Sequence, residues 1–352
     1  MSYSITSQIV ARQLKYFENK HILIAGALED TFATKLCESA KSVNIFTTNL
    51  AYANQMSSYS QINTQFGNIY RTDFKIDIVL LYWPKAKAEA EFLLSMLIAI
   101  LGKGIEIVVV GENRSGVRSI EKIFIPYGTV NKFDTARRCS LYWGQCIHEP
   151  APFVLEEWFI NYPLILSGCT LTIRSLPGVF SYGALDKGSQ LLLDTLPPLK
   201  GSVLDFGCGA GVIGIAIKQR YPNTHVTMVD INALAVASAK ETLRFNNIDG
   251  EVFASDVYSA IGSKFDNIIG NPPFHVGLKT HYTATETFLE GAPAFLNKKG
   301  QLMIVANRFL RYIQFIEGTF GHCYIPNKNK KFAIYHATKS GYLFNKLNGS
   351  SV

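Results

Sequence analysis

The sequence predicts an α/β protein made of two tandem domains, each built on a mostly parallel sheet. Strand-like apolar runs alternate with helical patterns in both halves, as in parallel strands joined by crossover helices. The 352 residues exceed the roughly 250–300 residues that one hydrophobic core usually holds. Segments of the first half also recur in the second, so we expect two similar domains.

The second half contains the clearer series of elements. Its expected strands lie at 202–206, 225–230, 251–254, 265–270 and 301–306, and its expected helices at about 212–220 and 233–246. Turn signals such as Pro222-Asn223 and Lys299-Gly300 separate these elements. A hairpin-like segment is expected within 155–181, before the first of these strands.

The first half has a similar rhythm, with expected strands at 21–25, 43–47 and 105–110. Residues 75–84 resemble 264–273, and 102–110 resemble 298–306. We interpret this as a diverged internal duplication, with chance similarity between two α/β units as the alternative. The segment 146–153 is a candidate linker, so the expected domains are 1–150 and 151–352.

Composition excludes several classes of protein. The six cysteines form no C-x-x-C pair, so we expect no disulfide framework, no metal site and a reducing compartment. There is no secretory signal, and the longest apolar stretch, 92–101, is too short to span a bilayer. We expect a cytoplasmic protein without membrane contact. The net charge of +7 permits an anionic partner such as RNA without requiring one.

A Gly-rich loop follows the first strand of the second domain and opens a helix. Glycines let the backbone approach a ligand, and the helix N-terminus offers free amide donors. The expected cofactor-binding residues of this loop are Asp205, Gly207, Cys208, Gly209 and Gly211. The acid suits a cationic ligand and would repel a phosphate, which favours S-adenosylmethionine over a dinucleotide.

Two more acids follow neighbouring strands. Asp230 ends the second strand, where a carboxylate can accept the ribose hydroxyls of a nucleoside cofactor. Asp256 follows the next strand and is expected near the adenine amine. This spacing makes a purely structural role for the Gly-rich loop a poor explanation.

The tetrapeptide Asn271-Pro272-Pro273-Phe274 follows the fourth strand, where open α/β sheets place their ligands. The Asn side-chain oxygen and the Pro272 carbonyl can accept hydrogen bonds from one planar amine, which frees its lone pair for attack on a methyl group. Phe274 offers a face on which a base can stack. We therefore expect these four residues to be catalytic, with Asn271 also bordering the cofactor, in an S-adenosylmethionine-dependent methyltransferase.

The chain resembles the ribosomal RNA small subunit methyltransferase C family. The resemblance covers most of the chain and is strongest over 175–306, in the segments 175–193, 271–275 and 305–310, with a further match at 331–337. It implies two tandem Rossmann-like class I methyltransferase domains. It also implies methylation of N2 of guanine-1207 in 16S rRNA, with the 30S subunit as partner, and we expect a monomer.

The resemblance implies that the first domain has lost its cofactor site. Ile24 stands at the Asp205 position, Leu28 at the Gly209 position, and Tyr82-Trp83-Pro84 replaces Asn-Pro-Pro. We expect this domain to be catalytically inactive and to support the second domain or hold RNA. Arg137 and Arg138 match a short family motif, and the sequence leaves open whether they contact RNA or the domain interface.

Alternatives remain at this stage. One is methylation of a release-factor glutamine at N5, although that family has a helical first domain and a tyrosine after Asn-Pro-Pro. Others are adenine N6 methylation and a non-enzymatic RNA-binding assembly protein. A set of basic residues could line a phosphate track or form a solvated surface: Lys298, Lys299, Arg308, Arg311, Lys328, Lys330 and Lys331.

Overall fold

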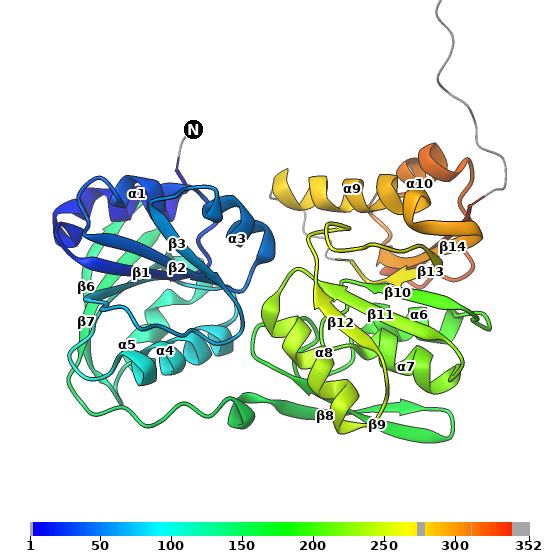
Figure 1. The fold of residues 1–352 in the computed structure, drawn as a ribbon, viewed down its shortest axis with the longest axis horizontal. Helices are drawn as coiled ribbons and strands as arrows, with labels where there is room; N and C mark the ends of the chain where they lie inside the picture. The colour runs from blue at the N-terminus through cyan, green and yellow to red at the C-terminus, as the bar shows by residue number, and fades with distance from the viewer. Residues whose placement is uncertain (1–2, 273–278, 311, 340–352) are drawn as a thin grey trace, which may run out of the picture. The chain divides into compact units, whose positions relative to one another are not determined.

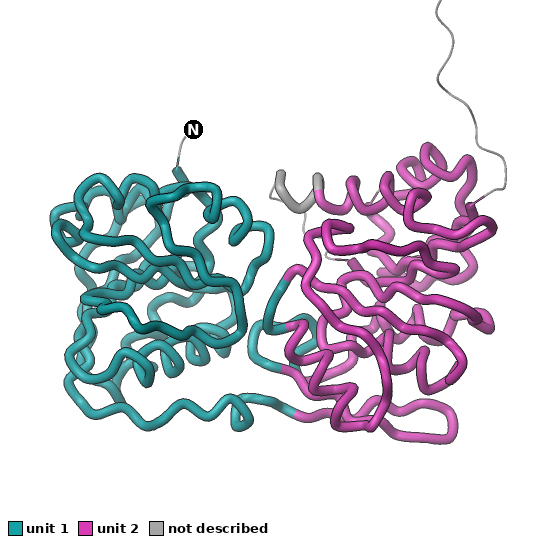
Figure 2. The backbone as a smooth tube through the Cα atoms, viewed as in Figure 1, with its two compact units in different colours: residues 1–160, 176–182, 232–234 teal, residues 161–175, 183–231, 235–352 magenta. Residues whose placement is uncertain are grey.

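The computed structural model describes residues 3–272, 279–310 and 312–339, and it leaves the side chains of 279–283 undescribed. The chain divides into two compact units (Figure 2). Unit 1 consists of residues 1–160, 176–182 and 232–234, and unit 2 of residues 161–175, 183–231 and 235–352. Both are α/β units, each with its own sheet (Figure 1).

Unit 1 has a seven-stranded sheet in the order β3-β2-β1-β4-β5-β7-β6. Its strands are β1 (His21–Gly26), β2 (Ser42–Thr47), β3 (Ile62–Phe66), β4 (Ile78–Tyr82), β5 (Glu106–Glu112), β6 (Gly128–Ala136) and β7 (Cys139–Cys146). The first five are parallel, while β7 runs antiparallel to β5 and β6. The strands expected at 21–25, 43–47 and 105–110 are confirmed as β1, β2 and β5.

Helices pack on the apolar strands of unit 1. They are α1 (Ile5–Val10), η1 (Ala11–Phe17), α2 (Phe32–Leu36), α3 (Leu50–Ser57), α4 (Lys87–Leu101), η2 (Asn113–Ser115), η3 (Val117–Ser119) and α5 (Ile120–Ile123). All five residues of β4 are buried, as expected for a central parallel strand covered on both faces. The apolar run at 92–101 lies in α4, and six of its ten residues are buried in this unit.

Unit 2 has a six-stranded sheet in the order β12-β11-β10-β13-β14-β15. Its strands are β10 (Ser202–Phe206), β11 (His225–Asp230), β12 (Glu251–Ala254), β13 (Phe265–Gly270), β14 (Leu296–Asn307) and β15 (Phe332–Thr338). The first five are parallel, and β15 is antiparallel to β14. The sequence of strands therefore matches β3-β2-β1-β4-β5-β7 of unit 1, as an internal duplication predicts.

Unit 2 has five helices among the described residues. They are α6 (Lys187–Thr195), α7 (Val212–Arg220), α8 (Ala233–Phe245), α9 (Lys279–Phe295) and α10 (Tyr312–Phe320). Of these, α7 and α8 confirm the two helices expected from the sequence. Strand β14 begins at Leu296, five residues earlier than the expected 301, because Leu296 pairs with Phe265 ahead of an irregularity in the register. The core includes Phe288, whose ring stacks on Phe206 with centroids 3.8 Å apart.

A short η4 turn (Leu155–Trp158) and a two-stranded sheet precede β10. Its strands are β8 (Ile160–Leu166) and β9 (Cys169–Ser175), and the two-residue connection makes it a hairpin, as expected from the sequence. All six cysteines carry free thiols. Within the described ranges no helix is both long and apolar enough to cross a bilayer, and no three His, Cys, Asp or Glu residues cluster as metal ligands would.

Candidate active site

The Gly-rich loop joins β10 to α7 in unit 2. Gly207, Gly209 and Gly211 have φ angles of 70°, 54° and 82°, a region that other residues seldom adopt. The amides of Gly207 and Cys208 donate to the carbonyl of Val229 at 2.9 and 3.0 Å, which ties the loop to β11. The loop is therefore held by its backbone, and α7 begins directly after Gly211. Burial raises the pKa of the Cys208 thiol, which makes this cysteine a weak nucleophile.

Asp205 lies under this loop and is completely buried. Its Oδ2 accepts the amide of Gly214 at 2.8 Å, while its buried Oδ1 accepts no hydrogen bond within the described part of the chain. Burial raises the pKa of Asp205 to about 7, a value that already includes the lowering effect of the Gly214 hydrogen bond and a smaller raising effect of the nearby Asp230. An unsatisfied buried acceptor costs about 1–3 kcal/mol, and a cationic donor bound here would satisfy it.

The other two expected acids lie at the same edge of the sheet. Asp230 ends β11, and its Oδ2 accepts the amide of Gly209 at 2.9 Å. Asp256 follows β12 and is half-buried, with its amide donating to Ser259 Oγ at 3.0 Å. Because β12, β11 and β10 are adjacent, the structure brings the three carboxylates to consecutive strand ends.

Asn271 follows β13, the strand on the other side of β10. Its Nδ2 donates to Asp186 Oδ2 at 3.1 Å and to Ser189 Oγ at 3.0 Å. Asp186 is also the N-cap of α6, because the same Oδ2 accepts the amides of Gly188 and Ser189. The first turn of α6 therefore holds the amide nitrogen of Asn271.

Backbone packing limits which residue can precede Asn271. A Cβ added to Gly270 would lie 2.4 Å from the carbonyl oxygen of Phe206 on β10, so glycine is required at this position. Pro272 is buried. Pro273 and Phe274, two of the four expected catalytic residues, lie outside the described residues.

Sequence reasoning did not identify Asp186 and Ser189 as site residues. It named 175–193 as a segment that carries the family resemblance, without assigning individual roles. The pattern Asp186-x-x-Ser189 before an apolar run indicates the start of a helix. Nothing local indicates the contact with Asn271, which lies 85 residues beyond Asp186.

The equivalent place in unit 1 is filled by side chains. Ala25 pairs with Leu81 in unit 1 as Phe206 pairs with Gly270 in unit 2, so Tyr82 occupies the position of Asn271. Tyr82 is 2% exposed, and its hydroxyl is hydrogen-bonded to Ser7 Oγ at 3.0 Å. Ile24, at the Asp205 position, and Leu28, at the Gly209 position, are also buried. This edge of unit 1 therefore lacks counterparts of Asp205, Gly209 and Asn271, although Gly26 keeps the positive φ of Gly207.

Arg137 and Arg138 form the turn between β6 and β7. Both have positive φ angles, 50° and 64°, which suit a two-residue hairpin turn. The guanidinium of Arg137 donates to Gln8, and the carbonyl of Arg138 accepts the amide of Asn113 at 2.8 Å. These contacts lie within unit 1, and a role for either arginine in RNA binding stays a prediction.

Two family descriptions match this chain. "Methyltransferase small domain N-terminal" matches residues 7–162, and "Methyltransferase small domain" matches residues 170–336. The second match contains Asp205, Asp230, Asp256 and Asn271.

Curated proteins named Ribosomal RNA small subunit methyltransferase C are similar along nearly the whole chain. The protein of Aliivibrio fischeri (strain ATCC 700601 / ES114) is 57% identical over 339 residues, which are 96% of this chain and 100% of its own length. That of Vibrio vulnificus (strain CMCP6) is 56% identical over 338 residues, 96% of this chain and 99% of its own.

One solved structure is similar in fold over both units. It is the T. thermophilus 16S rRNA N2 G1207 methyltransferase (RsmC) in complex with AdoMet and guanosine. The TM-score is 0.81 at 22% sequence identity, and the match covers 96% of this chain and 92% of the other. The two tandem Rossmann-like class I methyltransferase domains are therefore confirmed as the fold.

Proposed function

The chain belongs to the ribosomal RNA small subunit methyltransferase C family, and we propose that unit 2 methylates the exocyclic N2 of a guanine in 16S rRNA with S-adenosylmethionine. The solved relative supports guanine-1207 as the target, because its name states this nucleotide. One observation carries the proposal. Asp205, with a buried unpaired oxygen, and Asn271, with its amide nitrogen held, lie at the same edge of neighbouring strands.

The residues around the Gly-rich loop fit a nucleoside with a cationic amino acid tail. The ammonium group would satisfy Asp205 Oδ1, which is a buried acceptor without a partner. In this proposal Asp230 accepts ribose hydroxyls and Asp256 accepts the adenine amine, and the backbone at Gly207 and Gly209 allows close approach. When bound, S-adenosylmethionine supplies a methyl group on a positively charged sulfur.

Asn271 is oriented by its contacts with α6. Its two N–H donors are directed to Asp186 and Ser189, so the amide cannot turn over without losing both hydrogen bonds. Oδ1 accepts no hydrogen bond from a described residue. Asn271 therefore presents an acceptor, and the Pro272 carbonyl is the second acceptor of the expected pair.

Two acceptors of this kind suit the guanine amine. The N2 amine is planar because its lone pair is delocalised into the ring, which makes it a weak nucleophile. Hydrogen bonds from its two N–H groups to Asn271 Oδ1 and the Pro272 carbonyl favour a pyramidal nitrogen and direct its lone pair at the methyl carbon. The N–C bond forms as the methyl–sulfur bond breaks, and the amine then releases one proton to solvent. Positioning is the main catalytic contribution of the chain in this scheme.

Unit 1 is proposed to be catalytically inactive and to support unit 2 or RNA binding. Its occupied edge around Tyr82 and the buried Ile24 in place of Asp205 support this proposal. The α/β sheet of unit 1 also speaks against the release-factor methyltransferases, whose first domain is helical. We further propose that the chain works as a cytoplasmic monomer on the 30S subunit.

Methyl transfer to defined substrates tests the proposed function. The chain is incubated with radiolabelled S-adenosylmethionine and either naked 16S rRNA or 30S subunits, and the modified nucleotide is mapped. The proposal predicts label on N2 of one guanine. Label on adenine N6, on a release-factor protein, or on no substrate overturns it.

A further inference from the structure

A cluster of exposed basic residues lies where β14 ends and β15 begins. The carbonyl of Lys331 accepts the amide of Arg308 at 2.9 Å, which brings the residue after β14 beside the residue before β15. Phe309, next in the chain, is 68% exposed, although it is a large aromatic side chain. We name this cluster the basic edge, and it consists of Arg308, Phe309, Lys328, Lys330 and Lys331.

The basic edge adjoins Asn271 within unit 2. Strand β14 lies directly beside β13, and β15 lies beside β14. Adjacent strands are about 4.8 Å apart, and Lys331 lies two strands across from Asn271 and three register positions farther along, which separates the two residues by roughly 14 Å. Helix α6 also links the basic edge to Asn271. A Cβ added to Gly188 would lie 3.2 Å from the Phe332 ring, and Gly188 lies in the first turn of α6, two residues after Asp186.

The backbone of the basic edge is ordered by Asn329. Its Oδ1 accepts the amides of Lys331 and Phe332 at 2.9 and 2.8 Å, which closes a tight turn before β15. Its carbonyl accepts Arg308 Nη1 at 3.2 Å. The charged side chains therefore project from a defined turn, which lowers the entropy lost when they bind a ligand.

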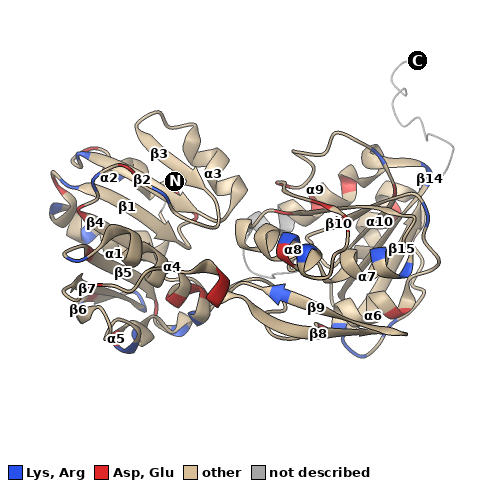
Figure 3. Cartoon of the chain, turned by 60° about the horizontal axis from the view of Figure 1, so that its bottom comes forward, with Lys and Arg blue, Asp and Glu red and all other residues tan. Residues whose placement is uncertain are grey.

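The charges of the basic edge are not neutralised within the chain. Arg308, Lys328, Lys330 and Lys331 are all exposed, and none of them forms an ion pair in the parts of the chain that the structure describes. Figure 3 shows that the lysine and arginine segments of unit 2 lie on several elements, including α8 and β9. Like charges held together at one edge favour a polyanionic partner.

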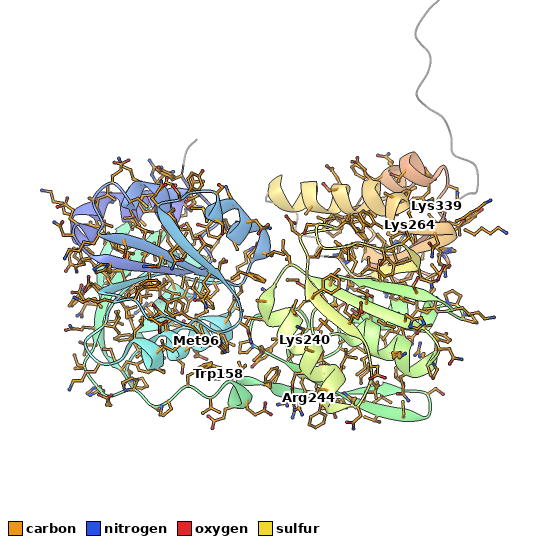
Figure 4. The ribbon with its side chains drawn as sticks, in the orientation of Figure 1. Met96, Trp158, Lys240, Arg244, Lys264 and Lys339 are labelled. Carbon is orange, nitrogen blue, oxygen red and sulfur yellow. The ribbon has the colours of Figure 1, made fainter. Side chains whose placement is uncertain are left out.

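Other basic residues of unit 2 lie at the other end of β14, where the strand begins. Lys298 and Lys299 precede the paired part of β14, and from Gln301 to Asn307 the strand extends roughly 20 Å. Lys264 and Lys339 lie near each other there (Figure 4), and Lys339 Nζ donates to the carbonyls of Pro293 and Leu296 at 2.6 and 2.8 Å. Lys298 and Lys299 therefore do not belong to the basic edge, and a longer phosphate track that includes them stays a prediction.

We propose that the basic edge binds the rRNA strand next to the methylated guanine. Arg308 and Lys331 contact backbone phosphates, Lys328 and Lys330 add longer-range attraction, and Phe309 stacks on a neighbouring unpaired base. The inference rests on the proposed function, because it places the RNA strand around the base that Asn271 receives. It assigns RNA contacts to unit 2 itself, in addition to any that unit 1 makes.

The test compares two double variants that each remove two positive charges. Arg308→Gln/Lys331→Gln changes the basic edge, and Lys298→Gln/Lys299→Gln is the matched control at the other end of β14. Binding to a 16S rRNA fragment containing the target is measured by filter retention at several salt concentrations. We expect the first variant to bind about tenfold more weakly, with the slope of log affinity against log salt reduced by about 1 to 2.

Separate substitutions test whether Phe309 stacks on a base. Phe309→Ala should weaken RNA binding about tenfold without changing the salt slope, and Phe309→Tyr should restore the affinity. Calorimetry with S-adenosylmethionine should give wild-type affinity for every variant, which separates lost RNA contacts from misfolding.

The outcomes distinguish this inference from the proposed function. Equal losses in the two double variants, or an unchanged salt slope for Arg308→Gln/Lys331→Gln, overturn the basic edge as an RNA surface. A loss for 30S subunits with none for naked RNA assigns the surface to a ribosomal protein and also overturns the inference. A wild-type chain that binds the RNA but never methylates guanine overturns the proposed function while leaving the binding comparison intact.

Discussion

Asn271 Nδ2 donates a hydrogen bond to Asp186 Oδ2 at 3.1 Å, and this contact joins the expected catalytic asparagine to the N-cap of α6. One carboxylate oxygen thus starts a helix and sets the direction of an amide. The arrangement explains how a side chain with two chemically different ends presents its oxygen to a substrate amine. It also separates three roles that substitutions can test: accepting from substrate, orienting the acceptor, and capping the helix.

Removing the Asn271 side chain tests the acceptor role. Asn271→Ala should lower kcat by about 100-fold or more, because one of the two acceptors for the amine is lost. The affinity for S-adenosylmethionine should stay within about tenfold of wild type by calorimetry. Unchanged turnover would contradict the mechanism.

Changes at Asp186 separate orientation from capping. Asp186→Ala should reduce kcat by about 10- to 100-fold through misplacement of Asn271, and it should also cost about 1 kcal/mol of stability as the cap is lost. Asp186→Asn keeps an oxygen acceptor and a good cap, so it should recover most of the turnover. Equal kcat for the two variants would argue against orientation by this residue.

Ser189 offers a cleaner test, since its Oγ holds Asn271 without capping the helix. Ser189→Ala should lower kcat about three- to tenfold, with little change in Tm or in the KM for RNA. Ser189→Thr retains the hydroxyl and serves as the control. A shift in Tm as large as that of Asp186→Ala would indicate a packing role for Ser189.

Cofactor binding should depend on pH through Asp205. Burial raises the pKa of Asp205 from 3.8 to about 7. Between pH 3.8 and pH 7 the folded chain therefore binds a proton that the unfolded chain has released. The free energy of unfolding therefore falls as pH rises through this window, and it levels off above pH 7. A cationic ammonium favours the ionised carboxylate, so affinity for S-adenosylmethionine should rise about tenfold from pH 6 to pH 8.

Asp205→Asn is the control for this pH dependence. It should bind the cofactor more weakly at pH 8 and show a flat profile between pH 6 and pH 8. Calorimetry in two buffers with different ionisation enthalpies should detect proton release at pH 6.5 in the wild type alone. The same pH profile in both proteins would move the ammonium site away from Asp205.

Tyr82 should behave as a packing residue of unit 1. Tyr82→Phe loses the hydrogen bond to Ser7 and should lower the free energy of unfolding by about 0.5–1.5 kcal/mol. Tyr82→Ala leaves a large cavity and should cost about 3–5 kcal/mol. Both should leave one cofactor bound per chain, measured by calorimetry. A stoichiometry of two in the wild type would show that unit 1 retains a cofactor site.

The sequence predicted the fold of both units because their elements depend on local patterns. Apolar runs broken by turn residues indicated the strands. Three glycines marked the loop after β10, and all three have positive φ angles in the structure. Asp205, Asp230 and Asn271 could be placed at strand ends because parallel strands share the direction of their carboxyl ends. Boundaries were less accurate where pairing decides them, as at Leu296 of β14, which pairs with Phe265 before the register shift.

By itself, the sequence determined the two α/β units, and it predicted a cofactor loop after β10 and an acceptor tetrapeptide after β13. Only the tertiary structure decided that Asp186 and Ser189 hold Asn271, that Tyr82 fills the equivalent place in unit 1, and that Arg308 lies beside Lys331. The physical reason is the range of the interactions. Turn and helix signals act over a few residues, whereas these contacts join residues brought together by strand order and register, which depend on how the whole sheet packs.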